Sequence, residues 1–451
     1  MGVCIMETQC IDKVNEKLPI YKLLPLGLQQ VLAMYAGVII VPVLVGAGIG
    51  MNQEQIAYLV AADLFTCGIA TLIQSVGIGN FAGIKLPVIL GCAFQAVSPM
   101  IIIGTQFSIG SIYGAIIASG IFVILCSFFF EKLLKFFPPV VIGSIITVIG
   151  LSLINVAINN LGGGVGSPDF GSSNNLLLGS FVLIFIIIVN TFCKGFLQSI
   201  SVLLGIIVGT VAASLLGMVD FSIIGTEPWF RIVHPFYFGK PEFHLVPILL
   251  ICIISIVSMI ESTGVFFAAG NVCEKEISGK EIAKGLRAEG LAQMVGGVFN
   301  SFPYTTFSQN VGLIALTGVK SRFVVIVGGF ILIVLGMLPK LAAVATIIPA
   351  CVLGGAMIAL FGMVAMSGIK TLQQVDFSKT SNMLVAGCSI ALGLGVTMVP
   401  NIIEKFPTYL KMVFESGIVT CSLAAIVLNI CLNFKEIFKQ SLLKSESQNL
   451  N

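Results

Sequence analysis

The chain has 451 residues and a formal net charge of +3; 57% of its residues are hydrophobic and only 10% are charged. A soluble protein of this length would carry about 25% charged residues, so the composition excludes a water-soluble globule. The near-neutral charge gives no reason to expect a nucleic-acid partner. A lipid bilayer is the expected environment of most of the chain.

Fourteen apolar runs follow one another along the chain, each about long enough to cross a bilayer as a helix. They occupy residues 24–47, 54–75, 83–104, 111–130, 137–157, 175–192, 197–217, 245–270, 282–300, 305–320, 323–339, 343–367, 382–399 and 413–433. Gly and Pro interrupt the third and tenth runs, and the ninth begins with charged residues. The sequence therefore predicts an all-α polytopic membrane protein with 14 transmembrane spans.

Lysine and arginine are distributed unevenly between the two sides that this span count defines. With the N-terminus inside, 18 of the 23 Lys and Arg residues fall on the inner side of the membrane. Basic residues are enriched on the cytoplasmic side of membrane proteins. We therefore expect a multi-pass protein of the plasma membrane with both termini in the cytoplasm.

Two short sequence patterns that each occur twice indicate an internal duplication. The pattern P-x-x-V-[I/L]-G occurs at 138–143 and again at 349–354, an offset of 211 residues. Phe94-Gln95 in the third run parallels Phe307-Ser308 in the tenth, at an offset of 213. Two repeats of seven spans would have opposite orientations because seven is odd, as in many transporters. Chance, or a convenience of helix packing, would also account for motifs this short.

Three acidic residues lie within the apolar runs, namely Asp63, Glu261 and Glu289. A carboxylate at membrane depth is costly and marks a functional site by default. Glu261 has no cation in its own run and is favoured as a group that faces a polar cavity, with a hydrogen bond to a neighbouring helix as the alternative. Glu289 follows Lys284 and Arg287 and fits a salt-bridged helix start equally well. Asp63 fits better as a structural partner of unwound backbone.

The interrupted third and tenth runs indicate where a binding site would lie. Pro kinks a helix, and the Thr-Thr-Phe sequence at 305–307 favours extended backbone. Irregular backbone at membrane depth is tolerated where it lines a cavity, although an ordinary Pro-kinked helix is the alternative. The amides of Gln309 and Asn310 suit the cis-amide edge of a nucleobase. Phe94 would stack on a planar ring or simply pack.

A family resemblance rests on the stretch from Gln309 to Gly318. It matches [Q/E/P]-N-x-G-x(4)-T-[R/K/G], the signature of the nucleobase–ascorbate transporter family, also called nucleobase–cation symporter-2. Residues 27–37, 261–264 and 300–303 resemble the family's first span, eighth span and approach to the tenth. The resemblance thus covers nearly the whole chain except the tails, and the stretch 258–264 is similar to bacterial xanthine permeases.

The resemblance implies two inverted repeats of seven spans, with short antiparallel strands in spans 3 and 10. It also implies a core and a gate domain and a homodimer formed through the gate domain. The implied segments are a cytoplasmic tail at 1–23, the core at 24–130 and 245–340, the gate at 131–244 (with an outer loop) and 341–434, and a second cytoplasmic tail at 435–451.

The same resemblance implies roles for individual residues. Glu261 would bind the substrate and share proton coupling with Glu289. Gln309 would contact the base, and Asn310 would set affinity and specificity. The contact from the third span would come from three neighbouring residues, Ala93, Phe94 and Gln95.

Two positions depart from the family pattern. Many relatives have His where this chain has Gln30, and some have His or Asp where it has Val265. Proton coupling would therefore rest on the two glutamates or be arranged differently. Gln30 is then left, with Asp63, as a structural polar residue in the membrane.

These features predict a secondary active transporter that imports xanthine or uric acid by proton symport with elevator-like alternating access; Na⁺ is the other coupling ion left open. The alternatives are a carrier of uracil or another nucleobase, and a channel or anion exchanger on the same fold. Glu261 disfavours the exchanger because it would repel an anion. The sequence has no HExxH motif and no CxxC pair, so neither an enzyme nor a cofactor is expected.

Overall fold

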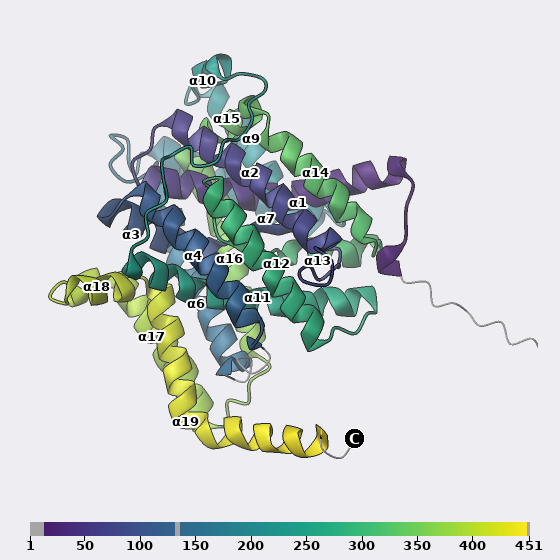
Figure 1. Ribbon diagram of the computed structural model, residues 1–451. Helices are drawn as coiled ribbons and strands as arrows, with labels where there is room; N and C mark the ends of the chain where they lie inside the picture. Colours follow the sequence, from purple (N-terminus) through teal and green to yellow (C-terminus); the bar gives the residue numbers. More distant parts are fainter. Residues whose placement is uncertain (1–12, 131–135, 449–451) are drawn as a thin grey trace, which may run out of the picture.

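The computed structural model describes residues 13–130 and 136–448 (Figure 1). Most of the predicted N-terminal tail, together with Lys132 and Lys135 of the charge count, lies outside the described residues. Most of the described chain is helical, as the long apolar runs predict.

The elements before the outer loop begin with a short 3-10 turn, η1. They are η1 (Lys13–Asn15), α1 (Ile20–Gly48), α2 (Gln53–Val76), β1 (Leu90–Cys92), η2 (Phe94–Ala96), α3 (Val97–Gln106), α4 (Ile109–Ser127), α6 (Pro139–Leu161), α7 (Ser173–Phe192), α8 (Phe196–Ser199), α9 (Ser201–Leu215) and α10 (Ser222–Thr226).

The elements after the outer loop end with a long helix that is kinked at Asn433. They are α11 (Leu245–Cys273), α12 (Gly279–Val298), β2 (Tyr304–Thr306), α13 (Ser308–Thr317), α14 (Arg322–Gly336), α15 (Pro339–Thr346), α16 (Ala350–Leu372), α17 (Thr380–Met398), η4 (Pro400–Ile403), α18 (Thr408–Glu415) and α19 (Gly417–Gln448).

Nine of the described helices are long and apolar enough to cross a bilayer, or ten if the bent pair α14–α15 is one span. The prediction of an all-helical polytopic membrane protein is confirmed at this level. The other predicted spans correspond to shorter or more polar helices. The helices α3 and α13 have 10 residues each and follow strands, α9 has 15 residues, and α12 carries several charges in its first half.

Polar side chains fix where several helices begin. Asn52 accepts a hydrogen bond from the backbone of Gln55 at the start of α2, and Ser278 does the same with Glu281 at the start of α12. In both cases the third helical residue bonds back, which completes a capping box. The caps satisfy backbone N–H groups that would otherwise be unpaired in the first turns of α2 and α12.

The only strands in the described chain form one short antiparallel pair, β1 with β2, deep in the protein. Leu90 pairs with Thr306, Gly91 with Thr305, and Cys92 with Tyr304. Short antiparallel strands in the third and tenth runs are what the family resemblance implies, and the structure adds their register. The pairing satisfies backbone groups that would otherwise be unpaired at membrane depth.

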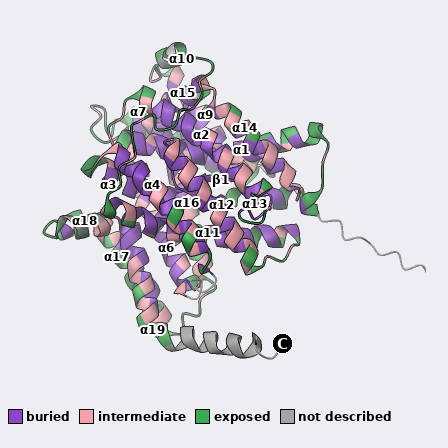
Figure 2. Ribbon diagram, viewed as in Figure 1, coloured by how far each residue is buried: buried purple, intermediate pink, exposed green. Residues whose placement is uncertain are grey.

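The helices pack in two sets around this pair. In the first set, α2 packs against α14 and α12, α4 packs against α12 and α11, and α1 packs against α14. In the second set, α6 packs against α16, α17 and α19, and α7 packs against α9 and α16. Figure 2 shows the first set largely buried, whereas α17 and α18 are mostly intermediate or exposed.

Glycines allow close approach at the main crossings. The carbonyl oxygen of Gly290 on α12 would lie 2.7 Å from a Cβ at Gly120 on α4, and that of Gly329 on α14 would lie 2.5 Å from one at Gly68 on α2. Small residues at helix interfaces are typical of membrane proteins because packing replaces the hydrophobic driving force.

The outer loop forms a strap, residues 227–244, across one end of the first helix set. Tyr58 on α2 donates to the His234 carbonyl, and its ring stacks on Tyr237 with centroids 3.6 Å apart. Farther along, the Phe236 amide donates to Val298, and the Glu242 side chain accepts from Ser108. The strap, predicted as an outer loop of the gate segment, therefore contacts the helices of the predicted core.

Candidate substrate site

A cavity of about 830 Å³ lies between the two helix sets. One wall comes from η2, α11, β2 and the first turn of α13, and the other comes from α6 and α16. Among the described residues that line it, Glu261 alone is ionisable. The strand pair, a helix N-terminus and one carboxyl group thus meet at a single site, as the interrupted runs predict.

Successive residues of β2 connect to the three acids found in the apolar runs. Side chains alternate between the two faces of a strand. The Thr305 side chain faces Glu261 and the cavity. The Tyr304 hydroxyl reaches Asp63 through Ser301, and the Thr306 hydroxyl bonds Glu289 behind the strand. The sequence therefore places three distant acids around one three-residue strand.

Glu261 lies on α11 and is partly exposed to the cavity. Its Oε2 accepts a hydrogen bond from Gln95 Nε2 at 3.1 Å and a longer one from Thr305 Oγ1 at 3.4 Å. Gln95 also donates to Ser258 Oγ at 2.8 Å. Gln95 therefore orients the carboxyl group, which still has an oxygen available to a ligand.

Glu289 lies on α12 behind the strand and does not line the cavity. Its Oε1 accepts a hydrogen bond from Thr306 Oγ1 at 2.7 Å, and its side chain is almost fully buried. The Thr306 amide in turn donates to Ser262 Oγ, which contacts Thr305 Oγ1 at 3.2 Å. Hydrogen bonds thus lead from Glu261 through Thr305 and Ser262 to the Thr306 amide, and the hydroxyl of the same threonine bonds Glu289. No ion pair among the described residues includes Glu289, so the salt-bridged helix start is not what the structure shows.

Asp63 is fully buried on α2. Its Oδ1 lies within hydrogen-bonding distance of Ser301 Oγ, at 2.7 Å, and of the Cys67 thiol, at 3.7 Å. Ser301 precedes β2, so Asp63 bonds a side chain of the irregular segment between α12 and the strand.

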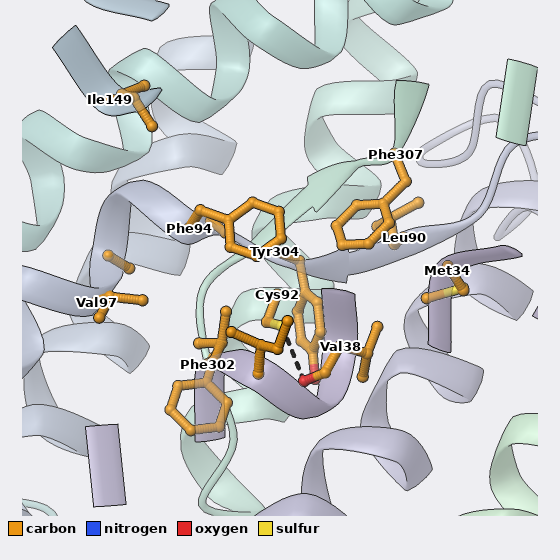
Figure 3. Close-up of a cluster of buried hydrophobic side chains, with 14 of the residues drawn as sticks. Met34, Val38, Leu90, Cys92, Phe94, Val97, Ile149, Phe302, Tyr304 and Phe307 are labelled. Carbon is orange, nitrogen blue, oxygen red and sulfur yellow. Dashed lines mark hydrogen bonds between the residues drawn. The ribbon is translucent and has the colours of Figure 1, made fainter. Parts of the chain in front are cut away.

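Two phenylalanines, one beside each strand, form the aromatic part of the site. The rings of Phe94 and Phe307 are 6.0 Å apart between centroids and nearly parallel, and Phe361 of α16 meets Phe94 edge-on. Figure 3 shows the two rings side by side, with Tyr304 pointing away toward the Cys92 thiol, which bonds the Val38 carbonyl.

The amides of the signature divide between the cavity and the protein interior. Gln309 is exposed at the start of α13 and lines the cavity. Asn310 is buried and faces α1, where its Nδ2 donates to the Gln30 side-chain oxygen at 2.7 Å. Asn310 and Gln30 thus lie behind the site. Ala93 does not line the cavity either; its amide donates to the Pro303 carbonyl and extends the strand pair.

The wall opposite Glu261 is apolar and was not anticipated from the sequence. Ile142 and Ile149 of α6 and Met363 of α16 line it, together with Ser367 of α16. Isoleucines in an apolar helix carry no signal that separates a cavity wall from lipid contact. Ser258 and Ser262, which flank Glu261, were also missed, although polar residues one turn apart beside a membrane acid are such a signal.

The arrangement suits a flat, polar heterocycle. One carboxyl group and one exposed amide offer directional hydrogen bonds, and aromatic and aliphatic side chains cover the faces of a ring. Within the described residues, no three His, Cys, Asp or Glu side chains lie close enough together to hold a metal ion. The chemistry available is binding and proton exchange.

A multi-pass helical protein with such a cavity at its broken helices has the architecture of a membrane permease. The sequence profile described as "Permease family" matches residues 21–402. The chain belongs to this family of xanthine and uracil permeases, nucleobase–cation symporter-2, which confirms the resemblance. It is a transport protein and not an enzyme.

Individual relatives cover almost the whole chain. The xanthine permease of Bacillus subtilis is 53% identical over 412 residues, which cover 91% of this chain and 94% of that protein. The uric acid permease PucK of the same organism is 50% identical over 408 residues, 90% of this chain and 95% of that protein. The uric acid transporter UacT of Escherichia coli is 43% identical over 425 residues, 94% and 88% respectively.

Solved structures share the fold at low sequence identity. The transmembrane domain of the cyanobacterial bicarbonate transporter BicA matches with a TM-score of 0.61 at 14% identity, covering 92% of this chain and all of that one. The murine anion transporter Slc26a9 matches with a TM-score of 0.59 at 11% identity, covering 96% of this chain and 74% of that one. The protein therefore has the SLC26-like fold.

Proposed function

We propose that this protein imports xanthine or uric acid by secondary active transport. The observation that carries the proposal is the cavity between the two helix sets, in which Glu261 and Gln309 lie beside Phe94. Relatives named as xanthine and uric acid permeases, about 50% identical over nearly the full chain, support the same substrates. The base would bond to Glu261 and Gln309 through its amide edge, with Phe94 against its face.

Uptake of radiolabelled xanthine into cells that lack their own purine permeases tests the proposal. We expect saturable uptake that xanthine and uric acid compete for better than uracil does. Glu261→Gln should lower uptake at low substrate by about ten- to a hundredfold, because a hydrogen bond to a charged group contributes roughly 1.5–3 kcal/mol. Glu276→Gln, at an exposed acid outside the cavity, is the matched control. Unchanged uptake in Glu261→Gln would remove this residue from the site.

Anion exchange on the same fold is disfavoured by the charge of the site. No Lys, Arg or His is among the described residues that line the cavity, and its one ionisable side chain is acidic. A carboxylate repels an anionic substrate, whereas a protonated carboxyl group can bond a neutral or weakly acidic base. A uracil carrier stays the nearer alternative, and the competition series separates it from a purine carrier.

We also propose that transport is coupled to protons through Glu261 and Glu289. Glu261 and Glu289 bond neighbouring residues of β2, Thr305 and Thr306, so a proton taken up at the cavity has a second carboxyl group on the other side of the strand. A proton uncoupler should then abolish accumulation of xanthine in the uptake assay. Accumulation that persists with the uncoupler but needs Na⁺ would assign the coupling to sodium.

The 14-span arrangement in two inverted repeats is supported by the packing. If span n corresponds to span n+7, the α2–α14 contact corresponds to α12–α4, and α7–α16 corresponds to α17–α6; all four contacts are present. The glycines of the two P-x-x-V-[I/L]-G motifs also occupy equivalent positions. A Cβ at Gly143 would lie 2.7 Å from Leu372 at the end of α16, and one at Gly354 would lie 2.1 Å from Leu161 at the end of α6.

The domain division follows the same helix sets. We propose that spans 1–4 and 8–11 form a core that slides past a gate of spans 5–7 and 12–14, because the cavity lies between these sets. The bilayer side is supported by basic residues that meet at one end of the core. There, Lys13 and Lys320 both bond Glu274, and Arg322 bonds the end of α2. This end would be cytoplasmic, with both termini.

A homodimer through the gate is proposed from the apolar surfaces of α7 and α17. Phe181, Ile184 and Ile188 on α7 and Leu392 on α17 are all exposed. Lipid would also cover such a surface. Chemical crosslinking of the detergent-solubilised protein, compared with its elution volume, distinguishes a dimer from a monomer.

A further inference from the structure

A chain of hydroxyl groups joins Asp63 to strand β2 in the buried space on the side away from the cavity. Ser301 Oγ lies 2.7 Å from Asp63 Oδ1 and 2.7 Å from the Tyr304 hydroxyl. The Tyr304 hydroxyl is also in hydrogen-bonding contact with Thr66 Oγ1. Thr66 Oγ1 is 2.6 Å from the Ala62 carbonyl oxygen, where the chain ends.

The three hydroxyl groups of this hydrogen-bonded series have one hydrogen fewer than its contacts require. The four oxygen–oxygen contacts each need a hydrogen, but the three hydroxyl groups of Ser301, Tyr304 and Thr66 supply one each. Thr66 must donate to the Ala62 carbonyl, since that oxygen carries no hydrogen. Tyr304 must then donate to Thr66, and Ser301 to Tyr304. The contact between Ser301 and Asp63 is left without a hydrogen unless the carboxyl group supplies it.

The surroundings of Asp63 agree with a neutral acid. Its Oδ2 is buried without a hydrogen-bond partner, which is far more costly for a carboxylate than for the carbonyl oxygen of a neutral acid. The titratable groups that face it are Cys67 on its own helix, Cys92 on β1, Tyr304 on β2 and Tyr113 on α4. None of these is a cation, and no ion pair among the described residues includes Asp63.

We infer that Asp63 carries a proton and, as a neutral hydrogen-bond donor to Ser301, is a positioning residue for the substrate strand β2. Through Ser301 and Tyr304 it holds the strand whose next residue, Thr305, contacts Glu261. The proton stays in place during transport, so Asp63 differs in role from the two glutamates. The inference rests on the proposed function for its transport readout only.

Asp63→Asn tests the inference because an amide N–H can replace the carboxyl O–H as donor to Ser301. We expect xanthine uptake within about twofold of the parent, since one neutral hydrogen bond replaces another of similar strength. We expect the pH profile of uptake to be unchanged. Asp63→Leu, of similar shape without a donor, should raise KM about tenfold through the lost hydrogen bond, with normal yield of folded protein on size-exclusion chromatography. If the leucine variant does not fold, Ser301→Ala should raise KM in the same direction.

Infrared spectroscopy of the purified protein reads the proton directly, without transport. The parent-minus-Asp63→Asn difference spectrum should contain the carbonyl band of a protonated carboxylic acid across the neutral pH range. Carboxylate bands in that difference, or loss of uptake in a folded Asp63→Asn protein, would overturn the inference. A parent that transports no purine, yet shows the acid band, would contradict the proposed function and leave this inference standing.

Discussion

Two glycines at the site, one in β1 and one on α11, differ in the space around them: Gly91 is crowded and Gly264 is not. Substitution of each by alanine therefore makes a matched pair of tests. A Cβ at Gly91 would lie 2.6 Å from the ring of Phe307, whereas one at Gly264 would point into the cavity with nothing within 4 Å. Gly91→Ala should therefore lower stability by about 1–3 kcal/mol through overpacking. Gly264→Ala should keep the melting temperature or raise it, because alanine favours a helix more than glycine does.

The transport readout separates the two variants further. One extra methyl group in a substrate pocket costs roughly 1–3 kcal/mol of binding, so Gly264→Ala should raise the KM for xanthine by about tenfold or more. Thermal unfolding in detergent and uptake kinetics measure the two effects. A normal KM in Gly264→Ala would mean that the substrate does not approach α11 at this position.

Single residues were predictable where placing them in the membrane costs free energy, as it does for acids. Asp63, Glu261 and Glu289 stood out because each acid interrupts an apolar run, and the structure places all three around β2. The division between Gln309 and Asn310 could not be predicted, because which of two neighbouring amides faces the cavity depends on the rotation of α13. The partner of Asn310 on α1 is 280 residues away.

At the scale of elements, the strap makes a prediction about pH. Glu242 accepts a hydrogen bond from Ser108 at 2.6 Å, and this bond, with those from Ser111 and His244, holds the pKa of Glu242 below its usual value. A carboxyl group whose pKa is lowered in the folded state contributes to attachment above its ordinary pKa. The attachment is lost as the pH falls through the lowered value.

Hydrogen–deuterium exchange over residues 227–244 measures this attachment. We expect strong protection at neutral pH and, with each rate divided by the intrinsic exchange rate at the same pH, weaker protection in acid, below the ordinary pKa of a glutamate. Glu242→Gln should exchange faster already at neutral pH, because the charge-assisted bonds are weakened. Glu404→Gln, at another exposed acid, is the control. Equal exchange in the parent and Glu242→Gln would show that the backbone contacts of the strap hold it alone.

Whole elements were predictable where they were long and apolar, and least so at the broken spans. The helices α1, α2 and α11 follow the predicted runs closely. The strands have three residues each, too short for a periodic pattern, and their presence was expected from the Gly and Pro interruptions and from the family resemblance. Their register depends on contacts between halves of the chain more than 200 residues apart, which no local pattern contains.

At the scale of the whole molecule, the direction in which the cavity opens is tied to the orientation in the membrane. Asn271 and Gln374 line the cavity and are exposed, near the end of α11 where Glu274 bonds Lys320, so we place the mouth of the cavity there. The strap lies across the other end of the core, where His234 is exposed. If basic residues mark the cytoplasmic face, the cavity opens inward in this structure.

Cysteine labelling with a membrane-impermeant thiol reagent tests the orientation and the state together. With the exposed Cys388 and Cys431 replaced by serine, Gln374→Cys should react in inside-out vesicles and not in intact cells. His234→Cys should show the reverse. Both sites reacting from the same side would refute the odd number of crossings between them, and exchanged sides would reverse the proposed orientation.

Substrate dependence of the same labelling addresses alternating access. Xanthine should slow the reaction of Gln374→Cys in inside-out vesicles, either because bound base blocks the cavity or because the core moves and closes the mouth. Asn271→Cys lies at the same mouth on the core side and should be slowed in parallel. Since the strap contacts core helices at Tyr58, Val298 and Ser108, core movement should also alter labelling at His234→Cys. Simple blockage would leave His234→Cys unchanged, which distinguishes a sliding core from a static pore.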